Sequence, residues 1–168
     1  MCYRLWIVSP LTLTEIRSML PPGFAADVAP PPEQRAFRPF LRSAQTVATL
    51  RIGGCACALQ LRGNGEDERH LRRRWAALGL TRERIIAALE RHRRDRPPVE
   101  DPETWRQALA GFVSEHARNA GPTAFLLGFG DQPPPSSAAP GLRAVPAAAV
   151  RHSPHGWLPE GSPVVVTP

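Results

Sequence analysis

The stretch DPETWRQALAGFVSEHARNAGPTAFLLGF, residues 101–129, carries the strongest structural signals in this sequence. Asp101 suits the cap of a helix and Pro102 its first position. Apolar residues follow at helical spacing, and they are Trp105, Leu109, Phe112 and Val113, with His116 on the same stripe. Residues 119–122, Asn-Ala-Gly-Pro, end that helix. The apolar run 123–129 is typical of a central strand covered on both faces, so we predict a helix packed on a sheet.

The N-terminal residues predict two strands joined by a short helix. Residues 2–8 alternate, with Tyr3, Leu5 and Ile7 on one face and Cys2, Arg4 and Trp6 on the other. A helix is expected over residues 13–20, because Thr12 and Glu15 have the spacing of a capping box. Residues 24–29 then predict a second strand. Roughly 15 residues between the strands suffice for a right-handed crossover that leaves the two strands parallel.

The longest strand signal covers residues 46–62. Residues 30–45 before it are expected to form a loop, with Phe37 and Phe40 buried beneath it. Leu50 and Ile52 lie at even-numbered positions, so they point to one face of a strand. Odd-numbered positions, which point to the other face, are occupied by Cys55, Cys57, Leu59 and Leu61. A strand changes its buried face only where an extra residue is inserted. We therefore expect the two glycines at 53–54 to form a bulge or tight hairpin that turns both cysteines toward one side.

A basic helical hairpin is predicted at residues 67–95. The apolar stripe of its first helix is Leu71, Trp75 and Leu78. Gly79 can end this helix, with Leu80 closing back on Trp75 in a Schellman arrangement. Thr81 caps the second helix, whose stripe is Ile85, Ile86, Leu89 and His92.

The end of the chain is proline-rich and carries weak strand signals at 142–150 and 162–167. We predict a single α+β domain over residues 1–130, followed by a linker and C-terminal extension over 131–168 with one or two weak edge strands. The element order predicts a small mixed or antiparallel sheet with helices packed on one face. The simplest such architecture is the ferredoxin-like β-α-β-β-α-β order, with the helical hairpin added to the second crossover.

The charge of the chain is carried by arginine alone, since all 21 basic residues are arginine. The formal net charge is +6, and residues 62–96 supply +5 of it. Concentrated positive charge suits an anionic partner such as nucleic acid. A GC-rich genome would also produce this excess of arginine, alanine, proline and glycine without any functional meaning. The absence of lysine excludes Schiff-base, pyridoxal-phosphate and Walker-type phosphate-loop chemistry.

The three cysteines indicate a reduced protein. Cys2, Cys55 and Cys57 are odd in number and lack the spacing of a disulfide framework, which predicts a bacterial-type cytoplasmic location. The apolar run at the N-terminus contains Arg4 and is too short for a membrane span or an export signal. We therefore expect no membrane association.

Cys55 and Cys57 are the candidate metal or thiol site. Side chains two residues apart on a strand project the same way, with Cα atoms roughly 6.5 Å apart, so two thiolates could share one metal or one oxidant. Further ligands would have to come from Cys2, His70, His92 or His116. The alternative, which we favour, is that both cysteines are small buried core residues, with no metal and no cofactor bound.

The stretch GLTRERI, residues 79–85, resembles the turn and recognition-helix start in region 4 of bacterial primary sigma factors. The resemblance implies a helix-turn-helix in which Arg82, Glu83 and Arg84 contact bases or phosphates. Trp75 stands where such a motif usually has a small residue. The cluster RHRRDR at 91–96 adds phosphate-binding candidates, which are Arg91, Arg93 and Arg94. The alternative is an ordinary solvated helix face and a good helix stop and start.

Catalytic motifs are scarce. Ser114, Glu115 and His116 are consecutive on a helix, so their side chains diverge rather than converge as a triad would. His152 and His155 lie near each other in an expected loop, where two histidines alone are more often exposed to solvent than ligands. The leading hypothesis is a non-enzymatic module that binds a protein or small-molecule partner. The second hypothesis is nucleic-acid binding by the hairpin 67–95, and the third is a cysteine-dependent metal or thiol-redox function.

Overall fold

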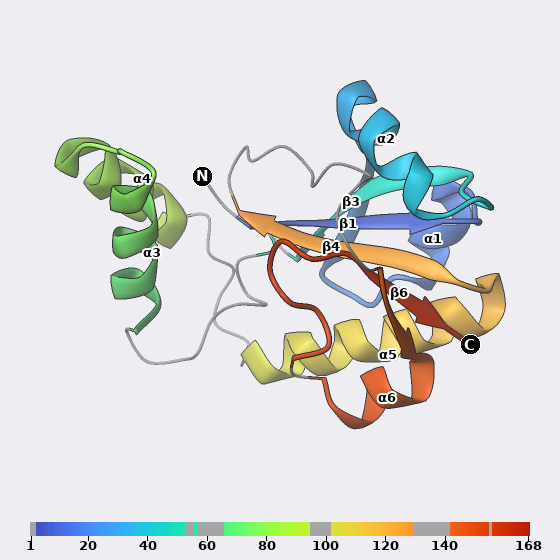
Figure 1. Ribbon diagram of the computed structural model, residues 1–168. Helices are drawn as coiled ribbons and strands as arrows, with labels where there is room; N and C mark the ends of the chain where they lie inside the picture. The colour runs from blue at the N-terminus through green and yellow to red at the C-terminus, as the bar shows by residue number, and fades with distance from the viewer. Residues whose placement is uncertain (1–2, 53–55, 57–65, 95–101, 130–141, 155) are drawn as a thin grey trace.

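The computed structural model describes residues 3–52, 56, 66–94, 102–129, 142–154 and 156–168, and these form one sheet with helices around it (Figure 1). The sheet has six strands in the order β2-β3-β1-β4-β6-β5, and six α-helices accompany it. All neighbouring strands are antiparallel except β5 and β6, which run parallel. The predicted α+β class is confirmed.

Strand β1 (Tyr3–Ser9) lies inside the sheet, between β3 (Thr46–Ile52) and β4 (Thr123–Phe129). It pairs antiparallel with both of them. Strand β2 (Phe24–Val28) pairs antiparallel with β3 and is the outer strand. Strands β1 and β2 therefore run in the same direction, as predicted, but β3 separates them.

The C-terminal residues complete this sheet. Strand β6 (Val164–Thr167) pairs with β4 and lies inside the sheet, so the prediction of an edge strand is wrong for it. Strand β5 (Arg143–Pro146) pairs with β6 and forms the edge. Between them, α6 (Ala147–His152) replaces the second half of the strand signal predicted at 142–150. Alanine has the highest helix propensity, and the three alanines after Pro146 follow that preference.

One face of the sheet carries the main core. Helices α1 (Leu13–Met19), α5 (Pro102–Ala120) and α6 pack there. The predicted stripe of α5 is buried at every position, including His116. The alternation of β1 is also confirmed, because Tyr3, Leu5 and Ile7 lie in this core. At the start of α1, Thr12 and Glu15 form the predicted capping box.

The other face is covered by a helix that we did not predict. Residues 30–45, expected as a loop, contain α2 (Pro31–Phe37) and a 3₁₀ turn (Arg38–Phe40). The prediction of helices on one face is therefore wrong, and Figure 1 shows α2 on the opposite side of the sheet from α5 and α6. Prolines are tolerated in a first helical turn, where their missing N–H groups have no intrahelical acceptor.

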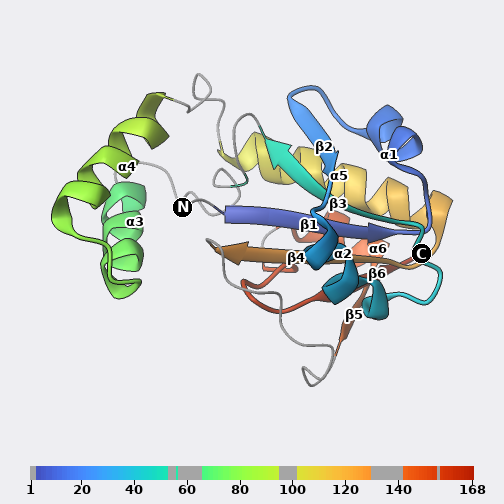
Figure 2. The ribbon, with the colours of Figure 1, turned by 90° about the horizontal axis from the view of Figure 1, so that it is seen from above.

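Helix α2 covers this second face incompletely, as Figure 2 shows from above. Its Phe37 and the following Phe40 are buried, as expected, against Trp6, Val8, Val47 and Leu126. Farther along β3, Thr49 is half-buried and Arg51 is exposed. A polar part of the face around these two residues is left outside the apolar cluster.

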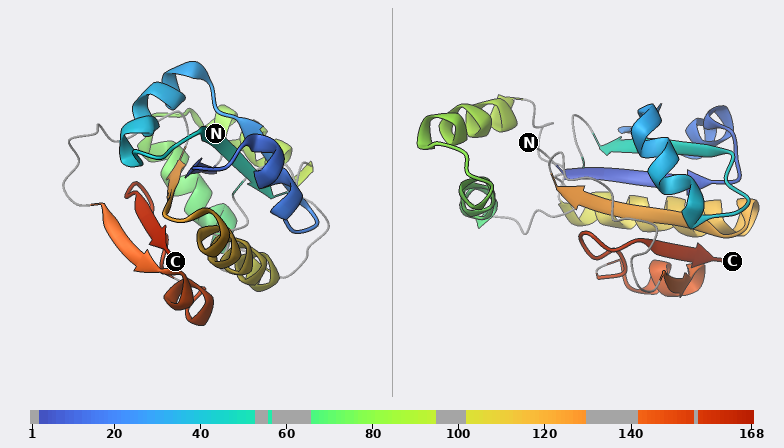
Figure 3. Two further views of the ribbon diagram at one scale, coloured as in Figure 1. Left: turned by 90° about the vertical axis from the view of Figure 1, so that its right-hand side faces the viewer. Right: turned by 45° about the horizontal axis from the view of Figure 1, so that its top comes forward.

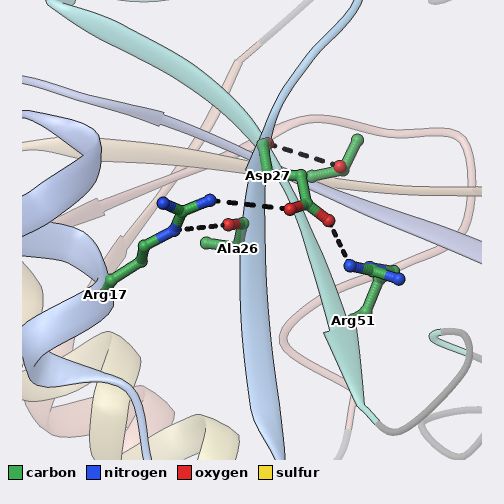
Figure 4. A network of polar contacts seen from close by, with 5 residues as sticks. Arg17, Ala26, Asp27 and Arg51 are labelled. Carbon is green, nitrogen blue, oxygen red and sulfur yellow. Dashed lines mark hydrogen bonds and ion pairs between the residues drawn. The ribbon is translucent and has the colours of Figure 1, made fainter.

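The outer strand β2 is held by a polar network (Figure 4). The carboxylate of Asp27 pairs with Arg17 of α1 at 3.6 Å and with Arg51 of β3. The Arg17 Nε–H also donates to the Ala26 carbonyl at 2.8 Å. Since an edge carbonyl left open can pair with another chain, Arg17 protects this edge of the sheet.

Helices α3 (Glu66–Ala77) and α4 (Arg82–Arg94) form the predicted hairpin, which lies beyond the end of the sheet where β1 begins (Figures 1 and 3). Gly79 has φ +78°, and the Leu80 N–H donates to the Trp75 carbonyl at 3.0 Å, which completes the predicted Schellman turn. Leu71, Trp75 and Leu89 are buried as expected.

Two predicted members of the hairpin stripes are exposed. Leu78 is 40% exposed, because α3 ends at Ala77 and Leu78 belongs to the turn. Ile86 is 42% exposed, because it lies about 100° around the helix from Ile85 and only one of the two can face the core. Each helix therefore has a narrower apolar stripe and a wider exposed surface than predicted.

Candidate nucleic-acid interface

The exposed sides of α3 and α4 are rich in arginine. We call this set the arginine surface, and it comprises Arg69, Arg72 and Arg73 of α3 with Arg82, Arg84, Arg91 and Arg94 of α4. Among the side chains of the two helices that the structure describes, only Glu83 and Glu90 are exposed acids. The surface therefore carries a clear excess of positive charge.

The helical spacing groups these arginines on the sides turned away from the core. Arg69, Arg72 and Arg73 follow an i, i+3, i+4 pattern, which places them side by side on α3. The Arg73 Nε–H donates to the Arg69 carbonyl at 3.4 Å, so part of this row is held along the helix. On α4, Arg84 and Arg91 are two turns apart on the same side.

Four of the five arginines predicted to contact nucleic acid have exposed side chains, and the contact itself stays a prediction. Arg82, Arg84, Arg91 and Arg94 are all exposed on α4, and the side chain of Arg93 lies outside the described residues. The prediction missed Arg69, Arg72 and Arg73, although they belong to the same basic hairpin. Their i, i+3, i+4 spacing opposite Leu71 and Trp75 was the signal that could have found them.

The turn between α3 and α4 has the glycine stop and the threonine cap that both interpretations of GLTRERI share. Gly79 takes the left-handed conformation, and apart from its chain neighbours no described residue has an atom within 4 Å of a Cβ added there, so the backbone angle selects glycine. The Arg84 N–H donates to Thr81 Oγ1 at 3.4 Å, which caps α4. The turn thus presents Arg82 and Arg84 in the first turn of a capped helix.

A cluster around Tyr3 joins α3 to the sheet. The Tyr3 hydroxyl lies 3.3 Å from His70 Nε2 and donates to Glu160 Oε2 at 3.2 Å. Glu160 also pairs with Arg74, whose guanidinium lies 5.1 Å from the centre of the Phe129 ring. These contacts tie α3 to the start of β1 and the end of β4, so the hairpin is attached to the sheet by its inner side.

His116 lies in the core, where it meets Ser9. The His116 Nε2 lies 2.8 Å from Ser9 Oγ, and both residues are fully buried. Ser9 Oγ also accepts the Leu11 N–H, so its own proton is available for His116. Burial lowers the pKa of His116 from 6.5 to about 4. His116 is therefore neutral at pH 7, and within the part of the chain that the structure describes its Nδ1 has no hydrogen-bond partner.

The other candidate residues either lie outside the described part of the chain or do not come together within it. Cys2, Cys55, Cys57 and His155 lie outside the described residues, as does the side chain of His92. His70 and His152 are exposed, and Glu115 is exposed whereas Ser114 is buried. Within the described ranges, no three His, Cys, Asp or Glu side chains converge on a metal site. The cysteine site and its core alternative both stay predictions.

Comparison of the chain with protein-family models, with curated proteins and with solved structures finds no match. Of the helices in the described part, none combines the length and the apolar character needed to cross a bilayer.

Proposed function

We propose that this chain is a non-enzymatic binding protein whose partner is a nucleic acid, bound by the arginine surface of α3 and α4. One observation carries the proposal. Among the described side chains of this helical hairpin, seven arginines are exposed but only two glutamates are. Arginine is the residue best suited to phosphate, because its planar guanidinium donates several hydrogen bonds and stays charged. The phosphates of a duplex or a single strand form a regular row along the backbone. Arginines in a row along a helix can contact several of them.

The two helices have different roles in this proposal. Arg82 and Arg84 stand in the first turn of α4, the part of a recognition helix that approaches base edges. The rows on α3 and farther along α4 contact phosphates and position the hairpin. The cluster of Tyr3, Arg74 and Glu160 supports α3 from behind, so that binding does not first have to order the hairpin against the sheet.

Fluorescence anisotropy with labelled duplex DNA, single-stranded DNA and duplex RNA tests the proposal. We expect binding at about 50 mM salt that weakens steeply toward 200 mM. Replacing Arg82 and Arg84 by alanine should weaken binding at least tenfold, the effect of losing about 1.4 kcal/mol. The matched control replaces Arg143 and Arg151, two exposed arginines of β5 and α6, and should change affinity little. Absence of binding to all three probes at low salt would refute the proposal.

We further propose that the four strands β2, β3, β1 and β4 form a ferredoxin-like unit. Their order in the sheet, with α1 between β1 and β2 and α5 before β4, supports this assignment. The hairpin α3–α4 is then an insertion in the second crossover, and β6 and β5 extend the sheet beyond β4. In this arrangement the nucleic-acid surface belongs to the insertion, and the sheet serves as its support.

A further inference from the structure

The uncovered part of the second sheet face borders a cavity of about 440 Å³. Its lining includes Arg4 of β1, Thr49 and Arg51 of β3, Asp27 and Val28 of β2, and Glu33 of α2. The strand register accounts for this set, since Asp27 and Arg51 flank Thr49 on the same face. The cavity therefore lies beside α2, where the apolar cluster of this face ends.

The charges around the cavity are unequal. Asp27 is shared by Arg17 and Arg51, and Glu33 accepts from Arg4 at 3.0 Å and from the Trp6 indole N–H at 2.6 Å. Two guanidinium groups and two carboxylates line the cavity, and Arg17, which does not line it, brings a third guanidinium to Asp27. The Arg4 side chain is 44% exposed against 15% for its partner Glu33, whereas the side chains of Arg51 and Asp27 are 48% and 47% exposed. The more exposed member of the Arg4–Glu33 pair is therefore the positive one, and Asp27 is neutralised by two arginines.

The rest of the lining is apolar. Val28 is 56% exposed at the rim, and Tyr3, Pro30, Leu50 and Ala56 also line the cavity. A cavity of this volume falls in the range of small-molecule sites and far exceeds the size of an inorganic ion. An exposed apolar rim beside paired arginines favours a ligand that has both an anionic group and an apolar body.

We propose that this cavity binds a small organic anion, whose carboxylate or phosphate group is held by Arg51 and Arg4 and whose apolar body packs against Val28 and Pro30. The site shares no residue with the arginine surface, because its lining comes from β1, β2, β3 and α2 together with Pro30 and Ala56. Binding of an organic anion in this cavity is therefore tested independently of nucleic-acid binding.

Titration with 8-anilinonaphthalene-1-sulfonate, an aromatic organic anion that fluoresces in apolar sites, tests the proposal on the full chain. We expect one saturable site per chain. Arg51→Gln should lower the affinity about tenfold by removing a charge-assisted hydrogen bond. Val28→Glu should lower it as much, because it places a negative charge at the rim while leaving both ion pairs intact. Arg143→Gln and the Arg82, Arg84 double alanine variant should bind the probe as the wild type does.

Circular dichroism of each variant checks that it is folded. If Arg51→Gln disturbs the fold, the probe affinity of Val28→Glu provides the test instead. Wild-type affinity in a folded Val28→Glu variant, or probe binding at many sites per chain, would overturn the proposal. Competition then identifies the anionic group, since benzoate carries a carboxylate and phenyl phosphate a phosphate. Failure of both competitors, or equal competition by inorganic phosphate alone, would contradict a site for an organic anion.

Discussion

His116 Nε2 and Ser9 Oγ lie 2.8 Å apart in the core, where α5 packs against the end of β1. Burial lowers the pKa of His116 to about 4, and among the described residues no group accepts a hydrogen bond from Nδ1, which carries a hydrogen in the charged ring. The folded protein therefore holds this histidine neutral at pH values where the unfolded chain binds a proton.

This difference in pKa predicts acid sensitivity. Between pH 6.5 and about 4 the unfolded state binds more protons at His116 than the folded state, so stability falls as the pH is lowered through this window. A shift of this size corresponds to about 3 kcal/mol once the window has been crossed. Urea unfolding of the wild type and of His116→Gln at several pH values measures it.

The variant should lose this part of the pH dependence, whereas replacement of the exposed His152 by glutamine should leave it intact. Parallel pH profiles for wild type and His116→Gln would show that His116 does not titrate as the structure implies.

Alanine substitutions at Gly128 and Gly111 should change the free energy of unfolding in opposite directions. A Cβ at Gly128 would lie 2.8 Å from the Trp6 ring, and Trp6 is held by its hydrogen bond to Glu33. Gly128→Ala should therefore cost about 1–3 kcal/mol of the free energy of unfolding. Gly111 lies inside α5, and outside the local helix backbone and its chain neighbours no described atom lies within 4 Å of the added Cβ, so Gly111→Ala should stabilise by about 0.5–1 kcal/mol. Thermal unfolding of both variants checks the pair, and a neutral Gly128→Ala would contradict the placement of Trp6.

Glu160 should control how firmly α3 is attached to the sheet. It accepts from the Tyr3 hydroxyl and pairs with Arg74, and both contacts weaken when its charge is removed. Glu160→Gln should raise amide hydrogen exchange in α3 about fivefold, the effect of losing about 1 kcal/mol, and leave α5 unchanged. Glu115→Gln, a change at an exposed position of α5, is the control. Equal exchange in α3 of wild type and Glu160→Gln would mean that this cluster does not hold the hairpin.

The elements that sequence could predict are those fixed by short-range signals. The capping box at Thr12, the turn at Gly79 and the stripe of α5 each depend on residues within a few positions, and the structure confirms them. Helix α2 was missed because prolines 30–32 suggest a loop, although prolines are tolerated at a helix start.

The polar clusters could not be predicted, because they join residues that are distant in the chain. Ser9 and His116 are 107 positions apart, and Tyr3 and Glu160 are 157 apart. Only the strand order brings them together, and that order depends on the packing of the whole sheet. The arginine surface was partly predictable, since charge and helical spacing are local properties of residues 66–94.

The salt dependence of nucleic-acid affinity tests the central claim most directly. The variants to compare are Arg69, Arg72 and Arg73 replaced together by glutamine, and a charge-matched control with Arg38, Arg143 and Arg151 replaced by glutamine. If the α3 arginines bind phosphates, the slope of log affinity against log salt should become shallower by about 1 for each phosphate-binding arginine that is replaced, and the control should keep the wild-type slope. Equal slopes for both variants would contradict the arginine surface as the binding site.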